Sequence, residues 1–290
     1  MVSQNMLNNP NINIIAQMGN VSVLEFNQDM SVTPLTSKQE YYSAQMNVKK
    51  RQVMIQLNND EYVLQSGAMQ WMSGNVNIKT GVKGAGDFLG KLVKAKVTKE
   101  SAIKPVYSGA GTLVLEPTYR HILLTDVSSW GGQIVLDDGL FLACQNTLQQ
   151  KVVARSNASS ALLGKEGLFN LSLVGSGIAV LESIVPMAEI IEVTLDNDVM
   201  KIDGNMAIAW SGSLDFTVEK STKSLIGSAA SGEGFVNVYR GSGKIWLAPV
   251  MASDYYAGQQ NTVENSDQQN TADTVSDAID VVSSIVDIFS

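Results

Sequence analysis

Nucleophilic or acid–base chemistry would have to draw on very few residues of this chain. His121 is its only histidine and Cys144 its only cysteine. Serine and cysteine hydrolases need a base beside the nucleophile, and no G-x-S-x-G elbow accompanies His121. Cys144 follows the apolar run 140–143, so we expect a buried, inert thiol with a raised pKa. The sequence therefore predicts no catalytic residue and a protein that is not an enzyme.

Motifs for metals and cofactors are equally sparse. No group of Cys and His has the spacing of a structural zinc site. The carboxylates at 137–138 and 196–198 do not continue with the spacing of a calcium loop, and turn formation explains them better. The glycines of 84–90 resemble a dinucleotide loop, but the third glycine stands one place late and no βαβ unit surrounds it. We therefore expect no metal and no cofactor.

Positive charge is concentrated between residues 83 and 104, where six lysines and two acidic residues give +4 (6 − 2). Between residues 84 and 96, apolar residues recur at i, i+1, i+4 and i+5, which predicts a short amphipathic helix inserted in the first of three sequence repeats. Such a segment could bind an anionic lipid surface or RNA, although a solvated helix face is the simpler interpretation. Nucleic acid is the less favoured ligand, because stacking aromatic residues are missing. The candidate contacts are Lys83, Lys91, Lys94, Lys96, Lys99, Phe88 and Leu92.

Negative charge is concentrated at the C-terminal end. Residues 258–290 hold six acidic and no basic residues, so the net charge of −8 leaves only −2 (−8 + 6) on the rest of the chain. We expect a polar linker at 258–272 and an amphipathic acidic helix at 273–290. An anionic membrane would repel this helix, which favours a protein partner or a second copy. The candidate partner contacts are Val275, Ile279, Val282, Ile285, Val286 and Phe289.

A threefold internal repeat organises the region between these charged segments. A Gly-x-Gly motif followed by an apolar stretch occurs three times, and the first glycines of the three motifs are evenly spaced along the chain. A second matching element lies upstream of each motif, at 64–69, 136–141 and 202–206, so the repeat spans about residues 60–250. The repeat glycines are Gly109, Gly111, Gly175, Gly177, Gly241 and Gly243.

Each repeat has the pattern of β-structure. Runs such as 168–174 and 235–239 are apolar or alternating, rich in β-branched and aromatic residues, and bounded by turn residues. We predict an all-β fold, a double-stranded β-helix or β-sandwich, in a single domain at 1–257. Its three repeats would pack around a pseudo-threefold axis and share one hydrophobic interior.

Three stretches resemble a known family: Val63–Val76, the glycine-rich stretch that leads to Thr98–Ser101, and Ile245–Pro249. Over about residues 12–250 the chain is similar to the altered-inheritance-of-mitochondria, or mitochondrial biogenesis, family, whose bacterial members were long described only as a domain of unknown function. The resemblance implies an all-β fold like that of the tryptophan RNA-binding attenuation protein, and no catalytic motif. In eukaryotes the family is associated with organisation of the inner mitochondrial membrane. Segment 29–60 is longer and more polar than the usual family opening.

Composition limits the location and the class of function. Charged residues make up 17%, below the roughly 25% of typical soluble domains, which indicates extensive sheet or subunit contact. The single cysteine fits a reducing compartment, and no signal peptide or membrane span is evident, so we expect a cytoplasmic protein. We predict a non-enzymatic assembly or scaffold protein that binds a protein partner or itself. The alternative is a module that binds an anionic ligand, including a membrane surface, through 83–104.

Overall fold

The computed structural model describes residues 5–81, 104–154, 169–204, 206–221 and 235–250. The chain divides into two units, Met1–Pro249 and Val250–Ser290, and only Val250 of the second belongs to the described part. The helix expected within 84–96, the linker at 258–272 and the helix at 273–290 all lie outside the described residues.

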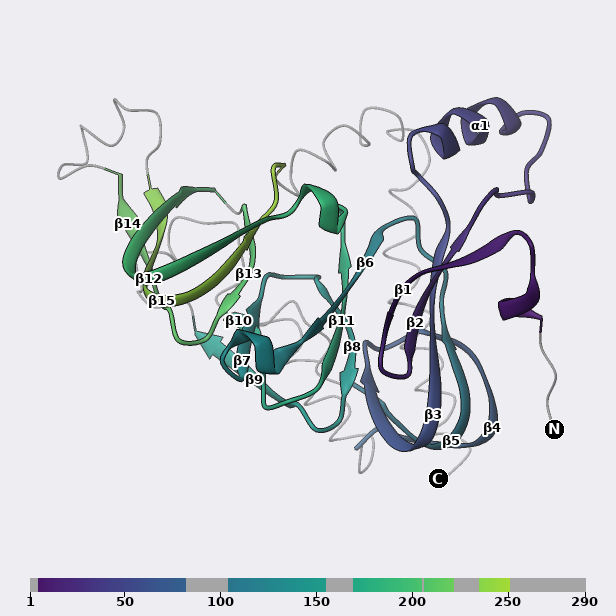
Figure 1. Cartoon of the computed structure of the whole chain (residues 1–290), viewed down its shortest axis with the longest axis horizontal. Coiled ribbons are helices and arrows are strands. Elements are labelled where there is room, and N and C mark those ends of the chain that lie inside the picture. The colour runs from purple at the N-terminus through teal and green to yellow at the C-terminus, as the bar shows by residue number, and fades with distance from the viewer. Residues whose placement is uncertain (1–4, 82–103, 155–168, 205, 222–234, 251–290) are drawn as a thin grey trace, which may run out of the picture. The chain divides into compact units, whose positions relative to one another are not determined.

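The described chain is built almost entirely from antiparallel strands in two sheets, which confirms the all-β prediction (Figure 1). The first sheet contains β1 (Ile12–Met18), β2 (Val21–Phe26), β3 (Arg51–Leu64), β4 (Met69–Lys79), β5 (Val106–Leu115), β6 (His121–Asp126), β8 (Phe141–Gln145) and β11 (Ile178–Ser183). The second contains β7 (Gln133–Leu136), β9 (Gln149–Ala154), β10 (Phe169–Val174), β12 (Ile191–Asp203), β13 (Ala207–Ser211), β14 (Asp215–Lys220) and β15 (Phe235–Leu247). The described chain also contains three short 3₁₀ turns, η1 (Met6–Asn8), η2 (Val127–Trp130) and η3 (Met187–Glu189), and one α-helix, α1 (Ser37–Gln45).

One backbone hydrogen bond recurs in all three repeats. The backbone N–H groups of Glu116, Glu182 and Ala248, which are evenly spaced along the chain, donate to the carbonyls of Ala68, Leu140 and Met206, each over 2.8 Å. In each repeat an entry strand (β3, β7 or β12) leads through a tight turn into a return strand (β4, β8 or β13). The sequence period is therefore a structural period.

In the first repeat the Gly-x-Gly motif is required because the chain passes close to a neighbouring strand. Gly109 has a φ of +127°, and a Cβ there would lie 2.1 Å from the carbonyl oxygen of Asn75. A Cβ on Gly111 would lie 2.0 Å from the carbonyl oxygen of Ser73. No side chain can occupy such positions without displacing backbone. The other four repeat glycines lie at the same place in their repeats, where β10 leads into β11 and in the middle of β15.

In the first and third repeats the motif lies opposite a bulge in the long strand that it pairs with. In β3 the register shifts at Asn59, whose φ is +58°, and in β12 it shifts at Asn197, whose φ is +51°. The second repeat has a wider interruption there, consisting of η2 followed by Gly131 and Gly132. A bulge bends its strand, so each long strand pair curls around its own apolar contents.

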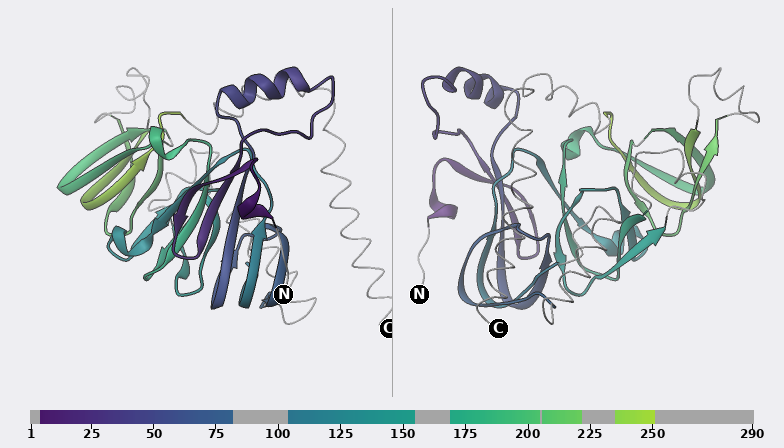
Figure 2. Two further views of the ribbon diagram at one scale, coloured as in Figure 1. Left: turned by 45° about the vertical axis from the view of Figure 1, so that its right-hand side comes forward. Right: turned by 180° about the vertical axis from the view of Figure 1, so that it is seen from behind.

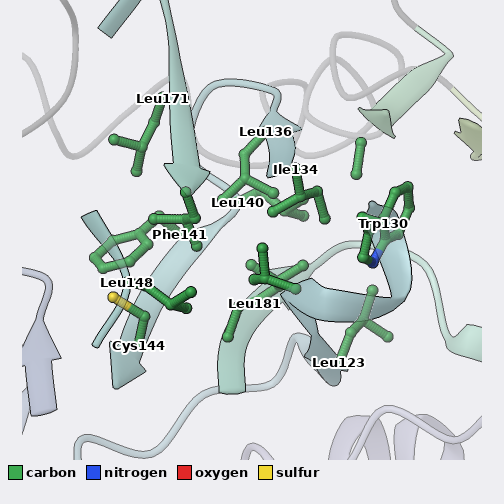
Figure 3. Packing of buried hydrophobic residues seen from close by; sticks show 14 of the residues in the cluster. Leu123, Trp130, Ile134, Leu136, Leu140, Phe141, Cys144, Leu148, Leu171 and Leu181 are labelled. Atoms are coloured by element: carbon green, nitrogen blue, oxygen red, sulfur yellow. The ribbon is translucent and has the colours of Figure 1, made fainter. Parts of the chain in front are cut away.

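The structure corrects the prediction of one hydrophobic interior shared by all three repeats. Buried side chains form one main cluster for each repeat, and the largest, around Leu136, Phe141 and Leu181, belongs mainly to the second repeat (Figure 3). Entry strand β3 pairs with β8, and entry strand β7 pairs with β13. No described strand of the first repeat pairs with one of the third. The repeats thus follow one another in series. The expected likeness to the tryptophan RNA-binding attenuation protein stays a prediction.

Helix α1 was not predicted, and it lies apart from the sheets (Figures 1 and 2). It buries no residue, and its sequence lacks the aliphatic residues at helical spacing that would reveal a packed helix. Its C-terminal end is well defined: the N–H of Val48 donates to Ser43 and that of Asn47 to Ala44, with Asn47 in the left-handed conformation. Among the described residues, no helix has both the length and the apolar character that crossing a membrane requires.

Candidate interaction site

His121 and Cys144, the two residues best suited to nucleophilic or acid–base chemistry, lie on different strands, β6 and β8. His121 is the first residue of β6 and is half-buried, and burial together with the nearby Arg51 charge lowers its pKa. Cys144 lies fully buried in β8, where burial raises the pKa of the thiol to about 12, as expected of an inert cysteine. The described part of the chain contains no group of three His, Cys, Asp or Glu side chains that could hold a metal ion.

The other predicted residues are placed only in part. Residues 137–138 belong to the turn between β7 and β8, and 196–198 surround the bulge of β12. The candidate anion contacts from Lys83 to Lys99, with Phe88 and Leu92, lie outside the described residues, and so do the candidate partner contacts from Val275 to Phe289. The structure therefore brings together neither of these two predicted surfaces.

A buried arginine that the sequence did not reveal forms the main polar centre of the described chain. Arg51 is 2% exposed at the start of β3. Its Nη2 lies 2.8 Å from Glu25 Oε2, and its Nε donates to the same oxygen over 3.0 Å. Nη2 also donates to the carbonyl and the Oδ1 of Asn47, each over 3.1 Å. A buried guanidinium needs such partners, because desolvating an unpaired charge is costly.

A second set of polar contacts lies beside this arginine. Lys50 Nζ lies 2.9 Å from Asp29 Oδ2, and the Tyr119 hydroxyl donates to the same carboxylate. These two interactions, with Tyr119 the stronger, lower the pKa of Asp29, while the carboxylate raises the pKa of Tyr119 to about 12. Lys49 Nζ lies 3.2 Å from Glu25 Oε1. We call the contacts of Arg51, Glu25, Asp29, Lys50 and Tyr119 the clamp.

The clamp holds both ends of a protruding segment, residues 27–50, which we call the arm. Its apolar side chains are unusually exposed: Leu35 is 94% and Met46 79% accessible. Tyr41 and Tyr42 stack edge to face with centroids 5.4 Å apart, and both are exposed. A cavity of about 570 Å³ lies between α1 and residues 27–32. The exposed large apolar residues of the arm are Met30, Val32, Leu35, Tyr41, Tyr42, Met46 and Val48.

The arm combines exposed apolar side chains with polar contacts that hold its two ends. Exposed apolar side chains that gather in one place often mark a binding surface. An isolated nine-residue helix is unstable in water, so the contacts of its two ends, rather than its own sequence, keep α1 in place. The site therefore presents apolar side chains at low entropic cost to whatever binds it.

Comparison with known proteins gives the family. The family model described as mitochondrial biogenesis AIM24 matches residues 42–250. The chain belongs to this family. An uncharacterised protein of Streptococcus pyogenes serotype M6 is 34% identical over 192 residues, which cover 63% of this chain and 75% of that protein. The crystal structure of another Streptococcus pyogenes protein is similar with a TM-score of 0.55 and 27% identity, covering 75% of this chain and 95% of that one.

The AIM24 match includes the three repeats and Arg51 but only part of the arm. It begins at residue 42, inside α1, so Asp29 and Glu25 precede it. The arm is thus assembled from residues on both sides of the family boundary. Neither streptococcal relative has a name that states a function.

Proposed function

We propose that this AIM24-family protein is a non-enzymatic assembly or scaffold protein, which binds protein partners through its β-domain and its C-terminal segment. The observation that carries the proposal is the arm, because it displays apolar side chains, two of them on α1 and the others on the chain beside this helix, and the clamp holds its two ends. The arrangement of His121 and Cys144 supports the same conclusion, since a buried thiol with a pKa of about 12 is a poor nucleophile.

The chemistry of the arm favours protein over a charged ligand. Its helix carries one lysine and one glutamate, Lys38 and Glu40, whose charges cancel. Lys49 and Lys50 are held in ion pairs at the base of the arm. Aromatic residues and methionine are enriched in the cores of protein interfaces, where charged residues are depleted. The C-terminal segment adds a second apolar surface, predicted from sequence, with acidic residues opposite.

Capture from native lysate tests this proposal. The full-length chain is compared with a chain lacking 258–290 and with Met46→Asp, and Met187→Asp serves as the control, because Met187 is an exposed methionine in η3 outside the arm. We expect the full-length chain and Met187→Asp to retain the same proteins in stoichiometric amounts. The truncated chain and Met46→Asp should retain less than a tenth. Equal retention by all four would refute the proposal.

The rival function is binding of an anionic ligand through Lys91, Lys94, Lys96 and Lys99. It rests on the charge of the segment alone. Titration with phosphatidylserine vesicles and with single-stranded RNA separates the two functions. Binding that collapses between 50 and 200 mM salt would favour the rival, since about six phosphate contacts produce that dependence. Absence of binding at low salt favours the assembly function. A cytoplasmic location, expected from the single cysteine, belongs to the main proposal.

A further inference from the structure

Two joints of the same design link the three repeats. At the first, β3 and β8 pair antiparallel with Val63 opposite Cys144. At the second, β7 and β13 pair antiparallel with Val135 opposite Trp210. All four side chains are buried. Each joint therefore joins the entry strand of one repeat to the return strand of the next.

Hydrogen bonds on either side of the opposed residues repeat as well. At the first joint, the N–H of Gln65, two residues after Val63, donates to the carbonyl of Leu142 over 2.8 Å. At the second joint, the N–H of Asp137, two residues after Val135, donates to the carbonyl of Ile208 over 2.9 Å. On the other side, Asn146 donates to Glu61 and Gly212 to Gln133, each over 2.9 Å. The register of the joint is thus a property of the repeat.

Strand pairing within the repeats shows which residue of the last entry strand, β12, corresponds to Val63 and Val135 at the two joints. Three residues have the same position in the sequence repeat: Val106, Ser172 and Val238. Their partners on the neighbouring strand are Val63, Val135 and Lys201, respectively. Lys201 of β12 therefore occupies the place that Val63 and Val135 occupy at the two joints. It is exposed, whereas they are buried.

The same comparison shows which residue of the first return strand, β4, corresponds to Cys144 and Trp210 at the two joints. Another three residues share one position in the sequence repeat: Leu113, Ala179 and Ile245. Their partners on the neighbouring strand are Met72, Cys144 and Trp210, respectively. Met72 of β4 therefore occupies the place of Cys144 and Trp210, and it is 37% exposed where they are buried.

Both of these strands are edges of the described sheets. Among the described residues, β12 pairs only with β15 and β4 pairs only with β5. Half of a joint is therefore left open at each end of the series of repeats. Edge strands offer unpaired N–H and C=O groups, and proteins normally protect them with charge or proline. Residues 69–78 of β4 contain neither.

We propose that a second copy of the chain completes the open joint, with β12 of one copy pairing antiparallel with β4 of the next. The proposal rests on the assembly function and names the partner as the chain itself. The register carried over from the internal joints places Lys201 opposite Met72 and Ile202 opposite Trp71. It also makes the N–H of Asp203 donate to the carbonyl of Gln70.

Charge and symmetry both suit this pairing. Strand β12 carries three aspartates, one glutamate and one lysine, while the only charged residue of β4 is Lys79, so no acidic pair meets across the joint. The two contacting surfaces are different, which makes the interface heterologous. Such interfaces close into a ring when the rotation permits and otherwise extend into a filament. Both outcomes complete the same joint.

Solution mass tests whether β4 is used. The full-length chain and two variants, Met72→Asp and Ile78→Asp, are compared by light scattering over a range of concentrations. Ile78 is the control, because it lies on the same strand with 42% exposure but beyond the joint. We expect the wild type and Ile78→Asp to associate, and Met72→Asp to weaken association at least tenfold with an unchanged circular dichroism spectrum. A monomeric wild type at high concentration would overturn the proposal.

Disulfide formation tests the register directly. Lys201→Cys and Met72→Cys chains are prepared separately, mixed and oxidised, since directly opposed residues on antiparallel strands lie within reach of a disulfide. We expect a mixed dimer from this pair and at least tenfold less from Lys201→Cys with Asn77→Cys. Equal yields, or association that Met72→Asp leaves intact, would refute the joint. Neither result bears on capture of lysate proteins, so failure here is distinct from failure of the assembly function.

Discussion

Removing the buried guanidinium of the clamp should destabilise the protein far more than removing an exposed one. Arg51→Met keeps most of the aliphatic volume but leaves Glu25 without its closest cation and Asn47 without a donor. Breaking a buried ion pair from one side costs about 3–5 kcal/mol. Because Glu25 is 12% exposed and keeps Lys49 at 3.2 Å, we expect the lower end, about 3 kcal/mol in the free energy of unfolding.

Urea unfolding followed by tryptophan fluorescence measures this loss. Arg240→Met is the matched control, because Arg240 pairs with Glu219 over 2.7 Å while both side chains are about a third exposed. That variant should lose less than about 1 kcal/mol. The double variant Glu25→Gln/Arg51→Met should be less unstable than the sum of its single variants, because the carboxylate is no longer left unpaired. Equal losses for Arg51→Met and Arg240→Met would refute the reasoning.

Two other perturbations test the repeat and the single histidine. Gly109→Ala should cost at least about 3 kcal/mol because its Cβ meets the Asn75 carbonyl, whereas Gly139→Ala, with a φ of +77° and open space, should cost about 1 kcal/mol in the same unfolding assay. Burial lowers the pKa of His121 in the folded protein below its ordinary 6.5. Below pH 6.5 the unfolded chain therefore takes up a proton on this histidine more readily than the folded protein does. The stability that the neutral histidine contributes is complete above pH 6.5 and is lost as the pH falls through the folded pKa. Wild type should therefore lose more stability than His121→Gln between pH 7 and 5, and parallel pH profiles would contradict this.

The regular part of the fold could be predicted because it depends on local chemistry. A backbone conformation with positive φ favours glycine, so a Gly-x-Gly motif that recurs at a constant spacing marks three copies of one unit. Cys144 could be interpreted for the same reason, since its apolar neighbours in the chain already indicate a buried strand.

The candidate site depends on contacts between residues that are distant in the chain. Arg51 reaches the carbonyl groups of Tyr119 and Arg120, and Tyr119 reaches Asp29. No spacing in the sequence announces such contacts, because they form only after separate strands have been brought together. Helix α1 was missed because nothing in the described chain covers it, so it has no apolar periodicity to detect.

Strands, turns and their threefold repetition could be predicted from residue types, since these features depend on only a few neighbouring positions. How the repeats are joined became visible only in the three-dimensional structure. Pairing of Val63 with Cys144 and of Val135 with Trp210 is a long-range event, so the sequence did not distinguish a closed arrangement from an open series. The series leaves one edge of β12 and one edge of β4 unpaired among the described strands, and the exposure of Lys201 and Met72 results from that arrangement.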